Sequence, residues 1–206
     1  MKEKRPSPFR QTLNEVYDFI GDIPIYGGWG YKRDDAIIID KYDTIVDTNQ
    51  PFNGIGLEYF LTRYRNYLEL ITFNRNTNKC SEIEFYMDSQ ETQFHEDCIY
   101  DHIVYTVAFF LDSDYVLLKD EWESGYGRKD FDLQAHRLKR SRLRKYLTRE
   151  VWFEIGSFFG EETLYRWNFY DGPFFLRKDG TKCPIEVPMA DITTRIFRRQ
   201  ITYGSM

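Results

Sequence analysis

The sequence predicts an α+β fold, with a mostly antiparallel sheet and about three helices packed against it. Apolar residues recur at helical spacing in some segments, and in others they alternate with polar residues as in half-buried strands. No internal repeat or long linker interrupts the 206 residues, and a chain of this length can bury a large core on its own. We therefore expect a single domain over residues 1–206, with residues 1–6 flexible.

Two helices are predicted in the first third of the chain. Ser7 is a suitable N-cap and Pro8 a suitable first residue for a helix that ends near Gly21. A second helix is expected to begin at Asn53 and Gly54. Its buried face is expected to carry Leu57, Leu61, Tyr64, Leu68 and Ile71, and its exposed face Glu58, Arg65, Asn66 and Glu69.

A third helical region is predicted from about Leu133 to Phe159, with a break near Thr148. Its main signal is a series of apolar residues at every fourth position, which a helix would place along one face. This series consists of Leu143, Leu147, Val151 and Ile155.

Strands are expected where β-branched and aromatic residues form short or alternating runs. The segment from Ile99 to Leu111 fits a strand by composition and a helix by length. Asp179-Gly180 is the pair that a type I′ turn favours, and Pro184 places its strand at a sheet edge. The expected strands are residues 36–39, 83–87, 115–119 (after a turn at 112–114), 165–169 and the two arms of a hairpin within 174–187.

Composition predicts a cytoplasmic protein. The basic N-terminus is not followed by an apolar segment of the kind found in secretory signals, and the longest nearly apolar run, Ile103 to Leu111, is far short of the ~20 residues of a membrane-spanning helix. Three widely spaced cysteines, Cys80, Cys98 and Cys183, do not form an even disulfide framework, so we expect reduced thiols.

Charge is strongly segregated along the chain, although the net charge is only −5. Residues 80–123 hold twelve acidic side chains and a single lysine, whereas residues 128–149 hold nine basic and two acidic side chains. The two segments could neutralise each other locally or form solvated faces. Alternatively, the acidic segment forms a surface that steers a basic partner toward aromatic anchors. The residues expected to bind such a partner are Asp112, Asp114, Tyr115, Asp120, Glu121, Trp122, Glu123 and Tyr126.

Two other functions remain as alternatives. Arg137, Arg140 and Arg144 would share one face of a helix and could contact phosphates, but a sequence pI of about 5.3 makes nucleic acid an unlikely partner. His95, Cys98 and His102 would share a helix face and could bind zinc, completed by Asp101 or a distant cysteine. In a strand, His95 would point away from the other two, so no metal site is expected.

No motif for a catalytic reaction was found. The phosphate-binding loop, the dinucleotide-binding glycine pattern, the nucleophile elbow and the HExxH zinc motif are all missing or incomplete. Asp112-Ser113-Asp114 resembles the DxD element of glycosyltransferases over three residues only, and an Asx turn explains it equally well. We expect no cofactor, and the sequence does not specify any small molecule.

The expected function is therefore a non-catalytic, cytoplasmic protein-interaction module that captures a basic protein partner without contacting a membrane. An immunity or inhibitor protein that covers the basic active site of a toxin is an example of this class. The alternatives are an enzyme of unrecognised, metal-dependent type that uses residues 95–123, and a nucleic-acid-associated protein that acts through residues 137–149.

Overall fold

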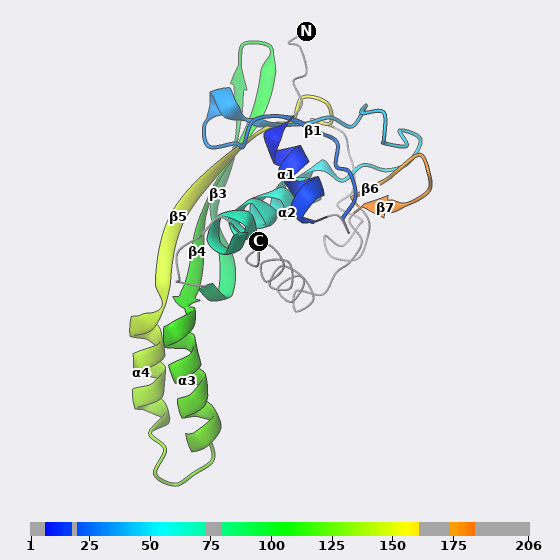
Figure 1. Ribbon diagram of the computed structural model, residues 1–206. Coiled ribbons are helices and arrows are strands. Elements are labelled where there is room, and N and C mark those ends of the chain that lie inside the picture. Colours follow the sequence, from blue (N-terminus) through cyan, green and yellow to red (C-terminus); the bar gives the residue numbers. More distant parts are fainter. Residues whose placement is uncertain (1–6, 18–19, 73–79, 161–173, 184–206) are drawn as a thin grey trace, which may run out of the picture. The chain divides into compact units, whose positions relative to one another are not determined.

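The computed structural model describes residues 7–17, 20–72, 80–160 and 174–183, and they form the α+β fold that the sequence predicts (Figure 1). The four α-helices of these ranges are α1 (Pro8–Val16), α2 (Gly54–Tyr67), α3 (Asp112–Gly125) and α4 (Leu133–Leu143). A 3₁₀ turn (Arg33–Asp35) and a π-helical turn (Leu68–Thr72) accompany them. The strands are β1 (Ile25–Gly27), β2 (Ile37–Ile39), β3 (Cys80–His95), β4 (Cys98–Leu111), β5 (Lys145–Glu154), β6 (Phe175–Leu176) and β7 (Lys182–Cys183).

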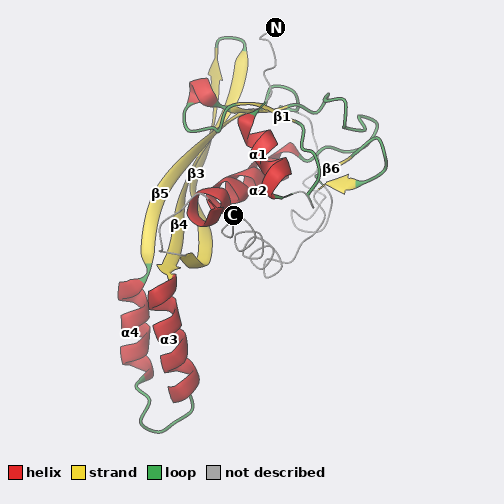
Figure 2. Cartoon of the chain, in the orientation of Figure 1, coloured by secondary structure: helices red, strands yellow, loops and turns green. Residues whose placement is uncertain are grey.

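The main sheet has five strands in the order β1-β2-β5-β4-β3, and β6 and β7 form a separate pair (Figure 2). β1 pairs with β2 in antiparallel fashion, whereas β2 pairs with β5 in parallel, with Ile37 opposite Phe153. The sheet is mixed but mostly antiparallel, as expected. The segment from Ile99 to Leu111, whose sequence fitted both a strand and a helix, belongs to strand β4.

The contacts of the chain divide it into two compact units. The first unit comprises residues 1–66, 90–103 and 150–206, and the second comprises residues 67–89 and 104–149. The first unit therefore contains α1, α2, β1, β2 and the small sheet, and the second contains the helices α3 and α4. The strands β3, β4 and β5 each contribute residues to both units.

Helix α1 begins where its capping signals predict. The hydroxyl of Ser7 accepts a hydrogen bond from the Arg10 amide at 3.3 Å, and Pro8 occupies the first position of the helix. Phe9 and Leu13, four residues apart, are buried on one face. The helix ends at Val16 with Tyr17 as its C-cap, earlier than the expected end near Gly21, which lies beyond it with a positive φ of 72°.

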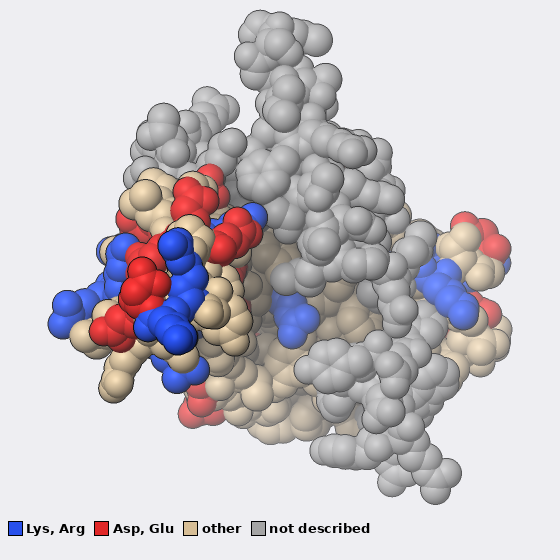
Figure 3. Space-filling view, turned by 90° about the horizontal axis from the view of Figure 1, so that it is seen from below, with Lys and Arg blue, Asp and Glu red and all other residues tan. Residues whose placement is uncertain are grey.

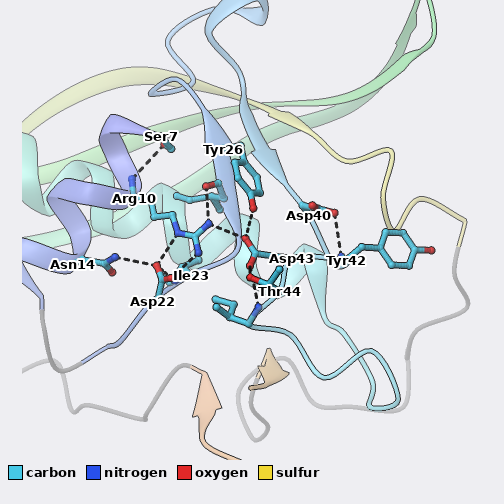
Figure 4. A network of polar contacts seen from close by, with 12 residues as sticks. Ser7, Arg10, Asn14, Asp22, Ile23, Tyr26, Asp40, Tyr42, Asp43 and Thr44 are labelled. Atoms are coloured by element: carbon cyan, nitrogen blue, oxygen red, sulfur yellow. Dashed lines mark hydrogen bonds and ion pairs between the residues drawn. The ribbon is translucent and has the colours of Figure 1, made fainter. Parts of the chain in front are cut away.

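Arg10 connects α1 to the segment before β1 and to the segment after β2 (Figure 4). Its guanidinium donates hydrogen bonds to both carboxylate oxygens of Asp22, at 2.7 and 2.6 Å, and to Asp43 at 2.8 Å. Asp43, only 4% exposed, also accepts a hydrogen bond from the hydroxyl of Tyr26 at 2.6 Å. Burial opposes ionisation of Asp43, but the hydrogen bonds from Tyr26, the Ile45 amide and Arg10 outweigh it and lower its pKa.

Helix α2 begins at the expected place, with the Asn53 side chain accepting a hydrogen bond from the Gly56 amide at 2.8 Å. The expectation that its polar face is exposed was wrong. Glu58, Arg65 and Asn66 are at most 1% exposed, so α2 is covered on both sides within the first unit. Arg65 donates to the carbonyl oxygens of Trp29 and Glu150 and lies over the Tyr31 ring, which compensates its burial.

The third helical prediction was only partly correct. The helix ends at Leu143, and residues 145–154 form strand β5 instead of continuing it. A spacing of four residues also repeats on one face of a strand, because four is a multiple of two. Val151 and Phe153 are fully buried in this strand, whereas Leu147 is exposed.

The predicted strand at residues 115–119 was also wrong, since these residues lie in α3 together with the expected turn at 112–114. Asp112 and Asp114 in the first turn favour a helix N-terminus. The half-buried Tyr115, buried Leu118 and partly covered Trp122 follow helical spacing beyond the point at which the strand was expected to end.

The predicted hairpin is present as β6 and β7, but its turn is not of type I′. Gly180 has a positive φ of 82°, whereas Asp179 does not, and Arg177 and Thr181 close the loop through a backbone hydrogen bond of 2.8 Å. The expected strand at 165–169, Pro184 and the flexible residues 1–6 lie outside the described residues. Within the described residues, no helix is long and apolar enough to cross a membrane.

Candidate interaction surface

Helices α3 and α4 form a helical hairpin between the neighbouring strands β4 and β5, in the second unit. Each helix has one buried residue, Leu118 of α3 and His136 of α4, which are 1% and 4% exposed. The imidazole of His136 hydrogen-bonds Glu121 at 3.1 Å and lies 5.5 Å from the Trp122 ring. Asp132 caps α4 by accepting hydrogen bonds from two amides of its first turn, so the two helices are locally well defined.

The residues expected to bind a partner all lie on α3 or at its C-cap, Tyr126. Trp122 and Tyr126 stack at 4.2 Å and are 38% and 62% exposed, so both rings are accessible in part. Asp112 at the helix start accepts a hydrogen bond from the Ser81 hydroxyl at 2.5 Å. The remaining residues of the set, half-buried or exposed, are Asp114, Tyr115, Asp120, Glu121 and Glu123.

Three carboxylates of the acidic segment are paired with the basic segment. Within the second unit, Glu82 pairs with Arg140 and Glu84 pairs with Arg144. Glu121 pairs with Lys139 in addition to His136, and the hydrogen bonds of these two residues lower the pKa of Glu121. In Figure 3, acidic and basic side chains are accordingly interleaved over the helical hairpin, at the left of the view. The acidic segment is thus partly neutralised within the chain and does not form a continuous negative field.

The carboxylates that remain without a cation within 4 Å, among the residues described, include Asp114 and Asp120 on α3. Glu123 has only Lys119 nearby, at 3.7 Å across one helical turn, and both side chains are more than half exposed. Such an exposed pair contributes little to stability. Asp114, Asp120 and Glu123 are therefore the part of the predicted acidic set that is available to a partner.

Three aliphatic residues of the hairpin that sequence reasoning did not select are also exposed. Val116 and Leu117 on α3 are 47% and 60% exposed, and Leu138 on α4 is 52% exposed. Their exposure could have been predicted from the sequence of a helical hairpin. Each of two paired helices buries only one face against the other, and these three residues do not lie on the faces that contain Leu118 and His136. The sequence-based assignment of residues 115–119 to a strand concealed it.

The basic segment offers phosphates fewer free cations than its sequence predicts. Arg137, Arg140 and Arg144 were expected to form one cationic face, but Arg140 and Arg144 are paired with glutamates and also lie over the Phe110 ring. Arg137 is exposed and has no acidic partner among the described residues.

The histidines and cysteine of the sequence HEDCIYDH lie at the β3–β4 turn and are not arranged as metal ligands. His95 is the last residue of β3 and Cys98 the first of β4. His102 stacks on Trp152 at 4.0 Å and contacts Glu150 at 2.8 Å. In the portion of the chain that is described, no three His, Cys, Asp or Glu residues are placed to hold a metal ion, and all three cysteines are free.

A second polar cluster, which the sequence did not reveal, lies in the first unit around the buried carboxyl groups of Glu58 and Asp101. Gln90 of β3 donates from its amide to Asp101 of β4 at 2.7 Å and to Glu58 of α2 at 3.4 Å. The hydroxyls of Thr92 and Tyr59 complete it, donating to Asp101 at 2.6 Å and to Gln90 at 2.5 Å. Burial, together with the charge of Asp101, raises the pKa of Glu58 well above its usual range.

No family model, curated protein or solved structure matches the chain.

The two sites differ in what they can do. The carboxyl groups of Glu58 and Asp101 are 0% and 4% exposed, so they are covered by the protein. Helix α3, in contrast, carries carboxylates without a nearby cation, among the residues described, beside exposed aromatic and aliphatic side chains.

Proposed function

We propose that this chain is a non-catalytic protein-interaction module whose α3 surface captures a basic protein partner. We define the α3 surface by two carboxylates and four apolar side chains of α3 and its C-cap. They are Asp114, Val116, Leu117, Asp120, Trp122 and Tyr126.

One observation carries this proposal. Asp114 and Asp120 lack a nearby cation among the described residues, and Leu117, which lies between them in the helix, is 60% exposed. A cationic partner would satisfy the carboxylates, and covering the leucine would remove apolar area from water at about 25 cal/mol per Å². Carboxylates of this kind mainly raise the association rate and reject unsuitable partners, whereas the apolar contacts hold the complex.

An immunity or inhibitor protein is the biological class that this behaviour fits best. Such a protein needs no catalytic groups, since it acts by covering a cationic surface of its target. A toxin with a basic, nucleic-acid-binding active site would present a surface of this kind.

The test uses the immobilised full-length chain in a capture experiment from its native host, followed by binding measurements with the purified captured protein. We expect a basic protein to be retained by the wild type and to be lost in an Asp114→Lys/Asp120→Lys variant. Raising the salt concentration should weaken capture, because Asp120 is exposed and Asp114 half-buried, and charges in contact with water are screened within about 10 Å at 0.1 M salt.

The matched control reverses two exposed carboxylates that lie elsewhere, in a Glu91→Lys/Asp97→Lys variant of the β3–β4 hairpin. The two variants have the same net charge, so they differ only in where charge was changed. Equal capture by both variants, or capture that depends on the β3–β4 hairpin alone, would contradict the assignment to α3.

A further inference from the structure

Two buried carboxyl groups of the first unit, Glu58 of α2 and Asp101 of β4, share a hydrogen-bonding neighbour in β3. The Gln90 amide donates to Oδ2 of Asp101 at 2.7 Å and to Oε2 of Glu58 at 3.4 Å. The Thr92 hydroxyl donates to Oδ1 of Asp101 at 2.6 Å. Oε1 of Glu58 is buried and has no hydrogen-bond partner. The four carboxyl oxygens are therefore one donor short.

The described neighbours of the two carboxyl groups provide no positive charge. From β3, the contacting side chains of Gln90 and Thr92 are neutral. On α2, the adjacent titratable group is Tyr59, whose pKa is raised by burial and by the charges of Glu58 and Asp101. Two ionised carboxylates would thus lie together, 0% and 4% exposed, without a cation, and such an arrangement is costly.

A single proton on Glu58 supplies the missing donor and also removes the second negative charge. A protonated carboxyl group can donate a hydrogen bond, which a carboxylate cannot. Burial, the charge of Asp101 and a hydrogen bond between the two carboxyl groups all raise the pKa of Glu58. The hydrogen bonding of the cluster is therefore complete with one proton and incomplete without it.

The same cluster connects the outer end of the β3–β4 hairpin to α2. Residues 90–97, which form this end in β3 and the turn, are exposed or half-buried, and none of them is buried. Phe94 contacts the ring of Phe159 but stays 70% exposed. Gln90, in contrast, bonds to Glu58 and also accepts a hydrogen bond from Tyr59 at 2.5 Å. A strand end with so little buried surface opens at low cost, so its attachment depends on the polar cluster.

We propose that Glu58 and Asp101 share one proton and act as a pH-sensitive latch between α2 and the β3–β4 hairpin. With the proton bound, the two carboxyl groups are hydrogen-bonded and residues 90–97 are held against α2. When the contact opens, Glu58 reaches water and releases its proton to the solvent. Two negative charges then oppose closing. The latch is independent of the proposed function, because its residues belong to the first unit and α3 to the second.

The direction of the pH response follows from the number of bound protons. Between the usual pKa of a glutamate, near 4.5, and the raised pKa of Glu58, the closed latch binds one proton more than the open latch. In this interval the opening constant rises about tenfold per pH unit, and it becomes constant above the raised pKa. Acid therefore closes the latch, and rising pH loosens it.

The first measurement detects the proton itself. Infrared spectra of the full-length wild type and of Glu58→Gln are compared at pH 7, where an ordinary glutamate is ionised. We expect the wild type to show the C=O band of a protonated carboxyl group, and we expect this band to be missing in Glu58→Gln. Identical spectra in this region would show that Glu58 is ionised, and the latch would then not exist.

The second measurement detects the opening, by hydrogen exchange of the full-length chain between pH 5.5 and 7.5. Each rate is divided by the intrinsic exchange rate at the same pH. For residues 90–97 we expect the opening constant of the wild type to rise about a hundredfold over this range. In Glu58→Gln, which keeps the size of the side chain but has no proton to lose, it should change less than about threefold.

The matched control is Glu91→Gln, which neutralises an exposed carboxylate of the same hairpin and should keep the wild-type pH response. If Glu58→Gln folds poorly, the wild type alone decides, because a rise below about threefold contradicts the latch. Residues 90–97 should also open at least tenfold more often than α1 of the same unit. Equal opening constants would mean that the contact breaks only when the whole unit unfolds, and the latch would again be refuted.

Discussion

Two buried carboxyl groups of the first unit, Asp43 and Glu58, have opposite acid–base behaviour. Asp43 is 4% exposed and receives hydrogen bonds from Arg10 and Tyr26, and its pKa is lowered. Glu58 is 0% exposed and lies beside Asp101 with no cation among its described partners, and its pKa is raised. Burial penalises both charges, so the neighbouring groups determine whether the buried group keeps its proton.

The difference has opposite consequences for stability. A lowered pKa, as for Asp43, contributes stability above the pKa of the unfolded chain, and this contribution is lost as the pH falls through the folded pKa. A raised pKa, as for Glu58, contributes stability that is complete below the unfolded pKa and is lost as the pH rises through the folded pKa. The chain should consequently lose stability from one site in acid and from the other toward alkaline pH.

The largest expected effect comes from removing the cation of the first site. Arg10→Met leaves Asp43 buried without a positive neighbour and should lower the free energy of unfolding at pH 7 by about 3 kcal/mol. In this variant the free energy of unfolding should also depend less on pH in acid, because the pKa of Asp43 moves back toward its usual range. Urea unfolding between pH 3 and 7 measures both effects.

The control for this prediction is Arg10→Lys, which keeps one charge but cannot contact Asp22 and Asp43 at the same time. Its free energy of unfolding should lie between those of Arg10→Met and the wild type. A loss below about 1 kcal/mol for Arg10→Met would mean that the Tyr26 hydroxyl and the backbone amide suffice for Asp43.

An intermediate effect of the opposite sign is expected at the second site. Glu58→Gln removes a group that must ionise at high pH while keeping its size, and the new amide can donate to Asp101. Stability at pH 9 should increase by about 1–3 kcal/mol relative to the wild type, with a smaller change at pH 5. Thermal unfolding across this pH range measures the difference.

Asp101→Asn serves as the comparison for Glu58→Gln, since it removes the other member of the pair. It should also lower the pKa of Glu58, because the repelling charge disappears. Parallel stability curves for the wild type and Glu58→Gln from pH 5 to 9 would show that Glu58 does not hold a proton in this range.

The smallest effect concerns the ion pairs of the second unit. Arg140→Met loses the contact with Glu82 and the position over Phe110, and should destabilise the chain by about 1 kcal/mol. Arg137→Met is the matched variant on the same helix, without an ionic partner among the residues described, and should change stability by less than about 0.5 kcal/mol. Equal effects would remove the distinction between paired and free cations on α4.

The sequence predicted those elements whose ends carry explicit signals. Ser7 with Pro8, and Asn53 with Gly54, placed the starts of α1 and α2 correctly, because caps act locally. Residues 145–154 were assigned wrongly because a spacing of four fits both a helix and a strand, and residues 115–119 because Asp112-Ser113-Asp114 was interpreted as a turn before a strand and not as the first turn of a helix. Tertiary packing decides such cases, and sequence spacing alone does not contain it.

For the candidate site, the sequence located the acidic and basic segments but did not show which acidic residue forms an ion pair with which basic residue. The contact between Glu82 and Arg140 joins residues 58 positions apart, and that between Glu84 and Arg144 joins residues 60 apart. Glu58 gave no signal of burial, because a carboxylate on a helix is normally exposed. The predicted binding residues remain a proposal, now restricted to those of α3 without a cation nearby.

The segment from Asp112 to Arg144 leaves the sheet at Leu111 and re-enters it at Lys145, at the ends of two strands that are already neighbours. A connection of this kind can be shortened to a tight turn without changing which strands pair. Evolution can therefore lengthen, recharge or exchange the helical hairpin while the sheet keeps its register. The same property makes this position suitable for grafting a foreign recognition element onto the protein.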